Sequence, residues 1–248
     1  MRKQLEFGFT AGDLVLITGA GSGIGRATAV RAAELGLSVA AWDLDQPGVA
    51  QTAELITRAG GRVLPVLADV GDAAAVERGF CATRREFGEI RYLVNNAGPS
   101  SASEIEFDAG VRIAVGSVRR MTETWLSEPV PPGAALVNIA SVAGNFLGTA
   151  SDWYSASKAA IAGYTRHLAG YRSDEVRSNA VAPGMVDTPR LRGFAASEVG
   201  QRSLQLNPMG RMAVGDDIAF AILFLLSPLA TYINGVVLPV DGGWLIAQ

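Results

Sequence analysis

The sequence predicts a doubly wound α/β fold, in which a parallel sheet of about seven strands carries helices on both faces. Short apolar, β-branched runs alternate with longer helical patterns along the chain, and several runs end in Gly, Asp or Asn. Alternating units of this kind imply right-handed crossovers and a parallel sheet. The expected strands are Leu14–Ile17, Val39–Trp42, Val63–Leu67, Tyr92–Val94, Leu136–Ile139, Val176–Val181 and Val236–Val240.

Composition favours one folded domain that spans residues 1–248. Hydrophobic residues make up 49% of the chain and charged residues 18%, which is too apolar for a disordered protein. The formal net charge is -3 without a block of like charge, so no nucleic-acid partner is expected. The longest apolar run, Ile218–Leu226, is shorter than the roughly 20 residues of a membrane-spanning helix. It therefore predicts a buried or interface helix, and no membrane partner is expected.

The N-terminus favours a cytoplasmic protein, and the single cysteine favours a packing role. Glu6 and Asp13 interrupt any apolar stretch of a signal peptide after Arg2 and Lys3, so a cytoplasmic location is expected. Because Cys81 is the single cysteine of the sequence, an intrachain disulfide is excluded, and Cys81 is expected to pack in the core. No metal ion is expected.

A glycine-rich turn follows the first expected strand. Residues 18–25 read TGAGSGIG and open a helical pattern. Glycines allow a tight turn and a close approach of the backbone to a pyrophosphate, which then meets the free N–H groups of a helix N-terminus. A structural turn between strand and helix is the alternative. In this context the turn predicts a Rossmann-type dinucleotide site with five residues: Gly19, Gly21, Ser22, Gly23 and Ile24.

The end of the second strand indicates which dinucleotide binds. Asp43 lies 18 residues past Gly25, the last glycine of the turn, where an acid hydrogen-bonds the adenosine ribose hydroxyls and repels a 2′-phosphate. Ser22 and Leu44 occupy positions at which a site for that phosphate would carry a basic residue. The sequence therefore favours NAD over NADP.

Polar residues at the ends of three strands are expected to share one edge of the sheet. Asp43, Asp69 and Asn96 each follow an apolar run, and ligands bind at the carboxyl ends of strands in such sheets. Taken singly, Asp43 also fits a solvated strand end and Asp69 a helix N-cap before residues 72–76. Their common edge favours cofactor binding for all three.

Tyr154 and Lys158 are the candidate catalytic pair. Their i, i+4 spacing puts both side chains on one face of a helix, where a lysine ammonium and an oxidised nicotinamide would favour the phenolate form of tyrosine. An exposed helix pair is the alternative. The chain holds 19 arginines but only two lysines, Lys3 and Lys158, so lysine at this position indicates a need for a compact ammonium.

Five motifs occur in order: TGAGSGIG at 18–25, NNAG at 95–98, NIASVAG around Ser141, YSASK at 154–158 and NAVAPGMVDTP at 179–189. Together they resemble the short-chain dehydrogenase/reductase family from Gly12 to Gly243. The resemblance implies Tyr154 as general acid/base and Lys158 as the group that lowers the pKa of the phenol and holds the nicotinamide ribose.

Further roles follow from the same resemblance. It implies that Ser141, 13 residues before Tyr154, anchors the substrate oxygen, although a polar strand end alone also explains this serine. Val186 and Thr188 are implied to hold the carboxamide. Asp69 and Val70 are implied to contact the adenine.

One family residue is absent. Members usually carry an Asn in the helix after NNAG, and no Asn occurs between Ala97 and Val137. Counting from Phe107 places Ala114 at that position, and segment 98–107 is shorter than in most members. The absence leaves open a catalytically silent NAD-binding regulator.

The leading hypothesis is an NAD(H)-dependent alcohol dehydrogenase/carbonyl reductase that transfers a hydride between nicotinamide and a carbonyl or secondary alcohol. An epimerase or dehydratase is a weaker alternative, because such relatives usually have longer C-terminal substrate domains. The expected partners are a small-molecule substrate and further copies of the chain in a tetramer or dimer. Apolar residues that flank the motifs suggest an apolar pocket: Pro99, Val142, Phe146, Trp153, Met185, Leu191 and Phe194.

Overall fold

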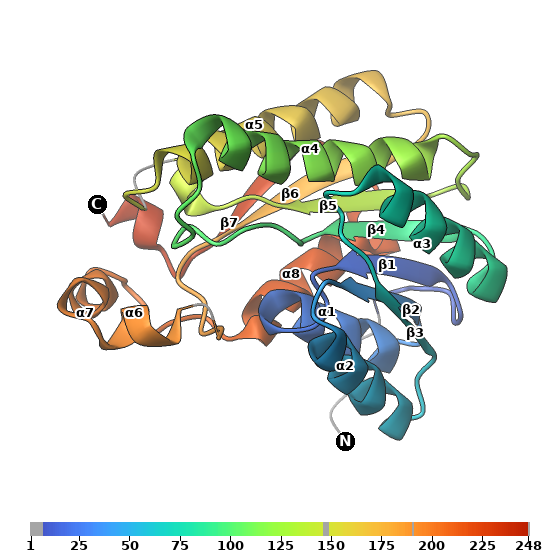
Figure 1. Cartoon of the computed structure of the whole chain (residues 1–248), viewed down its shortest axis with the longest axis horizontal. Coiled ribbons are helices and arrows are strands. Elements are labelled where there is room, and N and C mark those ends of the chain that lie inside the picture. Colours follow the sequence, from blue (N-terminus) through green and yellow to red (C-terminus); the bar gives the residue numbers. More distant parts are fainter. Residues whose placement is uncertain (1–6, 146–148, 190, 248) are drawn as a thin grey trace.

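The computed structural model describes residues 7–145, 149–189 and 191–247, which form an α/β sandwich around one sheet (Figure 1). Seven parallel strands lie in the order β3-β2-β1-β4-β5-β6-β7. They are β1 (Leu14–Thr18), β2 (Ser38–Asp43), β3 (Val63–Leu67), β4 (Ile90–Asn95), β5 (Ala135–Ile139), β6 (Arg177–Pro183) and β7 (Val237–Val240). The predicted fold is confirmed, and each predicted strand overlaps an observed one.

Helices cover both faces of the sheet (Figure 1). On one face lie α1, α2 and α8, and on the other α3, α4 and α5, while α6 and α7 stand apart from both layers. The helices are α1 (Gly23–Glu34), α2 (Gln46–Arg58), α3 (Ala73–Phe87), α4 (Phe107–Leu126), α5 (Asp152–Tyr171), α6 (Arg192–Ala196), α7 (Glu198–Gln205) and α8 (Gly215–Leu226), with 3₁₀ turns η1 (Val142–Gly144), η2 (Pro228–Ala230) and η3 (Trp244–Ile246).

The core consists of two large apolar clusters, one on each face of the sheet. Strand β1 contributes to both clusters: Val15 and Ile17 belong to one, and Leu14 and Leu16 to the other. Successive side chains of a strand point to opposite faces. A central parallel strand therefore carries apolar side chains toward both faces, which is why these runs stand out in the sequence.

The apolar run Ile218–Leu226 lies within α8, which packs against α1 and the sheet. Arg177 of β6 donates to the carbonyl oxygens of Leu225 and Leu226 at 2.9 and 3.0 Å, and burial lowers the pKa of this guanidinium. The last carbonyls of a helix lack intrahelical partners, so Arg177 fixes the end of α8 to β6. In the described part of the chain, no helix is long and apolar enough to cross a membrane.

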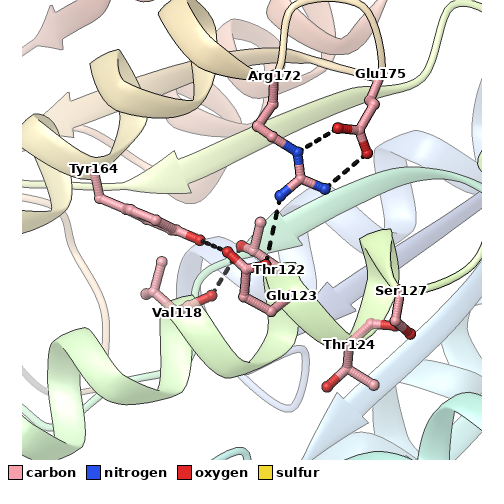
Figure 2. A network of polar contacts seen from close by, with 8 residues as sticks. All are labelled: Val118, Thr122, Glu123, Thr124, Ser127, Tyr164, Arg172 and Glu175. Carbon is pink, nitrogen blue, oxygen red and sulfur yellow. Dashed lines mark hydrogen bonds and ion pairs between the residues drawn. The ribbon is translucent and has the colours of Figure 1, made fainter.

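A polar network joins α4 to α5, the helix that carries the candidate catalytic pair (Figure 2). The Tyr164 hydroxyl donates to a Glu123 carboxylate oxygen at 2.9 Å. Arg172 lies 3.5 Å from the same carboxylate and also pairs with Glu175. Burial, together with the hydrogen bond to Glu123, raises the pKa of Tyr164 above its usual range, so the phenol stays protonated and keeps donating.

Cys81 is exposed, so the core position expected from the sequence is wrong. Helix α3 buries Val76, Phe80 and Thr83, which recur every three or four residues on one face. Cys81 follows Phe80 directly and therefore faces outward.

Candidate active site

The glycine-rich turn joins β1 to α1 through close backbone packing. A Cβ placed on Gly25 would lie 2.1 Å from the carbonyl oxygen of Gly19, which itself has a φ of +67°. Ser22 begins the helix without a side-chain cap, and the first turn of α1 carries no acidic residue. Its N–H groups and the positive end of the helix dipole therefore suit an anionic group such as a pyrophosphate.

Two side chains from neighbouring strands hold this turn in place. Asp43, at the end of β2, accepts from the Gly21 N–H at 2.7 Å. Asn96, directly after β4, donates through Nδ2 to the carbonyl oxygens of Thr18 and Gly19 at 2.9 and 3.1 Å. Both residues thus shape the turn from the carboxyl edge of the sheet.

The turn after β3 carries Asp69 on the same edge. Its Oδ1 accepts from the Gly71 N–H at 2.6 Å. Helix α3 is capped instead by Asp72, which accepts from the Ala74 N–H at 2.9 Å. The helix-cap interpretation of Asp69 is therefore wrong, and this residue is exposed.

The candidate catalytic residues meet where η1 packs against α5. A Cβ on Gly144 of η1 would lie 2.5 Å from the backbone carbonyl carbon of Lys158, so the two segments touch. Lys158 Nζ donates to the carbonyl oxygen of Ile139 at 2.7 Å and lies 5.4 Å from the centroid of the Tyr154 ring. Ser141 precedes η1 and caps it. The ammonium is thus tied to the segment that presents Ser141.

Trp153 fixes the start of α5. This buried ring lies against Gly110 of α4, where an added Cβ would come within 2.6 Å of it. It also meets the Tyr154 ring edge to face, with centroids 5.7 Å apart. The position of Tyr154 therefore depends on the packing of α4 against α5.

One cleft joins the catalytic and cofactor-binding candidates at the carboxyl edge of β1, β4 and β5, where the strand order reverses. Ten predicted residues line it: Gly19, Ser22, Gly23, Ile24, Asn96, Ser141, Tyr154, Lys158, Val186 and Thr188. The other five do not: Gly21, Asp43, Leu44, Asp69 and Val70. Of these, Gly21 lines an adjoining depression with Arg26 and Asp45. Among the described residues, no group of three His, Cys, Asp or Glu side chains suits a metal ion.

The apolar residues expected around the substrate are only partly brought together. Pro99 and Leu191 line the cleft, whereas Val142 and Trp153 are buried. Met185 lines a separate cavity, Phe194 is partly exposed, and Phe146 lies outside the described residues. Sequence reasoning missed Ser100 and Ser101, which line the cleft next to Pro99. Only their place just after the strand end pointed to them.

Ala114, which occupies the expected position of the absent Asn, is buried on the inner side of α4. Its carbonyl oxygen accepts from the Ser117 hydroxyl at 3.2 Å. A backbone acceptor is therefore present at residue 114, and a side-chain amide is not.

Comparison with known proteins shows which family the chain resembles. A family model described as enoyl-(acyl carrier protein) reductase matches residues 19–245. Levodione reductase of Leifsonia aquatica is 37% identical over 249 residues, which cover 93% of each protein. Cis-4-hydroxycyclohexanecarboxylate dehydrogenase of Sinomonas cyclohexanicum is 36% identical over 240 residues, 93% of this chain and 96% of that protein.

A solved short-chain dehydrogenase/reductase from Serratia marcescens superposes with a TM-score of 0.86 at 30% identity, covering 94% of this chain and 98% of that one. Sequence and fold thus match over more than nine-tenths of the chain. The chain therefore belongs to the short-chain dehydrogenase/reductase family and is an oxidoreductase that transfers a hydride between a nicotinamide cofactor and an alcohol or ketone.

Proposed function

We propose that the protein is an NAD(H)-dependent alcohol dehydrogenase/carbonyl reductase whose chemistry rests on Tyr154, Lys158 and Ser141. The supporting observation is that the Lys158 ammonium lies 5.4 Å from the Tyr154 ring, in a cleft that Ser141 and the glycine-rich turn also line. NADH absorbance, followed with a panel of ketones and alcohols in both directions, tests the proposal. Absence of turnover in both directions would contradict it.

The proposed mechanism moves one proton at Tyr154. A bound NADH supplies the hydride that reaches the carbonyl carbon. The Tyr154 hydroxyl gives its proton to the carbonyl oxygen, so that the C=O bond becomes C–OH and a phenolate remains. The Ser141 hydroxyl donates a hydrogen bond to the same oxygen, and the Lys158 ammonium stabilises the phenolate. Oxidation of an alcohol follows the same path in reverse.

The cofactor residues divide along the dinucleotide. We assign the pyrophosphate to Gly19, Gly21, Ser22, Gly23 and Ile24, with Asn96 holding the turn. The adenosine ribose is assigned to Asp43 with Leu44 beside it, the adenine to Asp69 and Val70, and the carboxamide to Val186 and Thr188. In this assignment residues 1–248 form one cofactor-binding and catalytic domain, and the expected cytoplasmic location stays a prediction.

Cyclic ketones and secondary alcohols head the substrate panel. The relative from Sinomonas cyclohexanicum is named for a hydroxycyclohexanecarboxylate, and Pro99 and Leu191 supply apolar lining in this cleft. We therefore propose a small carbonyl or alcohol substrate with an apolar ring or chain.

Cofactor preference is expected to depend on Asp43. The carboxylate would face the 2′-phosphate of NADPH, and neither Ser22 nor Leu44 compensates with a positive charge. The unmodified protein is expected to have a higher kcat/KM with NADH than with NADPH. Asp43→Ala should shrink this ratio, and an added Leu44→Arg should lower it further. Equal kcat/KM values for the two cofactors in the unmodified protein would refute the assignment.

The absent Asn is expected to matter little. In the family this residue helps to hold a water through which protons leave the lysine, and a backbone carbonyl can hold a water equally well. Ala114→Asn should therefore change kcat by less than about tenfold, or 1.4 kcal/mol. Steady-state kinetics of the two proteins on the ketone panel test this. Activity that arises only in Ala114→Asn would show that the natural chain lacks a working relay.

A homo-oligomer, either a tetramer or a dimer, is proposed. Strand β7 lies at an edge of the sheet, and Phe220, Leu229 and Tyr232 expose large side chains on α8 and in the segment before β7. Open strand edges and exposed apolar side chains favour association. Light scattering should give a mass well above that of one chain. A mass near 25.9 kDa at working concentration would rule the oligomer out.

A further inference from the structure

The turn of residues 69–72, here called the adenine turn, is tied to a distant helix by one side chain. Within the turn, the Asp72 N–H donates to the Asp69 carbonyl oxygen at 3.1 Å. Arg120 of α4 reaches across and donates from Nη1 to the carbonyl oxygen of Val70 at 2.9 Å. Among the hydrogen bonds of the described residues, this is the one that links the adenine turn to an element other than the adjoining α3.

This contact controls one peptide group from both sides. The C=O of Val70 and the N–H of Gly71 belong to the same planar unit. Arg120 donates to the Val70 oxygen of this unit, and the Gly71 N–H of the same unit donates to Asp69 Oδ1 at 2.6 Å. A rotation of this unit would move both groups together, so the direction of the Asp69 carboxylate depends on Arg120.

We propose that Arg120 is a positioning residue for adenine recognition, which it serves by holding the Val70–Gly71 peptide and thereby aiming the Asp69 carboxylate at the exocyclic amino group of the base. An amino group donates and a carboxylate accepts, so the pairing is chemically complementary. The inference rests on the proposed function, because that function places the adenine at Asp69 and Val70. In this proposal Arg120 contacts the turn and not the cofactor.

The neighbouring arginine offers a matched control. Arg119 lies one residue earlier on the same helix and is exposed, whereas Arg120 is half-buried with its guanidinium on the adenine turn. Arg119→Met removes the same charge from α4 without touching the turn. Arg120→Met keeps most of the side-chain length and removes the donor together with the charge, and Arg120→Lys restores both without the guanidinium fork.

The test compares ligands with and without adenine. Dissociation constants for NADH and for ADP-ribose are measured by titration, and kcat/KM is measured with reduced nicotinamide mononucleotide, which lacks the adenosine half. Arg120→Met should lower the affinity for NADH and for ADP-ribose by about tenfold, or 1.4 kcal/mol. It should leave kcat/KM with the mononucleotide unchanged. Arg119→Met should change neither the two affinities nor kcat/KM. The affinities of Arg120→Lys should lie between those of the unmodified protein and those of Arg120→Met.

A double-mutant cycle with Asp69 decides whether Arg120 acts through this carboxylate. In an Asp69→Ala background, Arg120→Met should weaken NADH binding little further, because no side-chain acceptor remains at residue 69 for Arg120 to position. Additive losses, unchanged NADH affinity in Arg120→Met, or an equal loss with the mononucleotide would each overturn the proposal.

Failure of the proposed function is distinguishable from failure of this inference. If the unmodified protein binds NADH without turnover, the proposed function fails, while the ADP-ribose titrations and the cycle still test Arg120. If it binds neither NADH nor ADP-ribose, both fail.

Discussion

Tyr154→Phe is expected to lower kcat for ketone reduction by about a thousandfold, or roughly 4 kcal/mol, while NADH binds as before. Phenylalanine keeps the ring that packs edge to face on Trp153 and loses only the transferable proton. Steady-state kinetics and an NADH titration measure the two effects separately. Lys158→Met should reduce kcat and also weaken NADH binding, because the ammonium is proposed to hold the nicotinamide ribose.

Tyr164→Phe is the matched control for this prediction. Tyr164 lies on the same helix, and its hydroxyl donates to Glu123 of α4 (Figure 2). Its loss should cost about 1 kcal/mol of unfolding free energy and leave kcat unchanged. Substantial activity in Tyr154→Phe would require a different acid/base in the cleft.

Gly25→Ala is expected to weaken NADH binding by at least about a hundredfold, or 2.7 kcal/mol. The new Cβ would lie 2.1 Å from the Gly19 carbonyl oxygen and 2.7 Å from Asn96 Nδ2. Neither the backbone nor the held amide can give way without opening the turn. The same crowding should lower the melting temperature. Calorimetry measures this temperature, and a titration measures the NADH affinity.

Gly170→Ala serves as the control for Gly25→Ala. Gly170 lies within α5, and nothing comes within 4 Å of an added Cβ there. Alanine is favoured over glycine inside a helix by about 1 kcal/mol, so this variant should be slightly more stable and bind NADH normally. Unchanged NADH affinity in Gly25→Ala would show that the turn does not hold the pyrophosphate.

The fold was predictable because its central strands are buried on both faces. Strand β5 reads ALVNI and is buried at every position, so its apolar run marks it without any knowledge of its neighbours. The ends of strands were harder to predict. Strand β4 begins at Ile90 rather than Tyr92, since the intervening Arg91 breaks the apolar run and falls at the irregularity between the Leu14–Ile90 and Val15–Tyr92 pairs.

The site was predictable where one short segment carries both the residue and its geometry. The glycine-rich turn and the Tyr154–Lys158 spacing are of this kind. Arg120 could not be predicted, because its partner Val70 lies 50 residues away and nothing local distinguishes it from Arg119. Cys81 was misplaced for a related reason: the burial habit of cysteine is an average, and the face of α3 on which it falls decides its exposure.

Transfer of deuterium from NADH to a product tests the central claim most directly. The protein is incubated with NADH that carries deuterium at both positions of nicotinamide C4 and with the cyclic ketone panel, and the alcohols are analysed by mass spectrometry. We expect one deuterium on the carbinol carbon with the unmodified protein, and about a thousandfold slower formation of this alcohol with Tyr154→Phe. NADH that binds but yields no deuterated alcohol from any ketone would contradict hydride transfer and leave only a cofactor-binding protein.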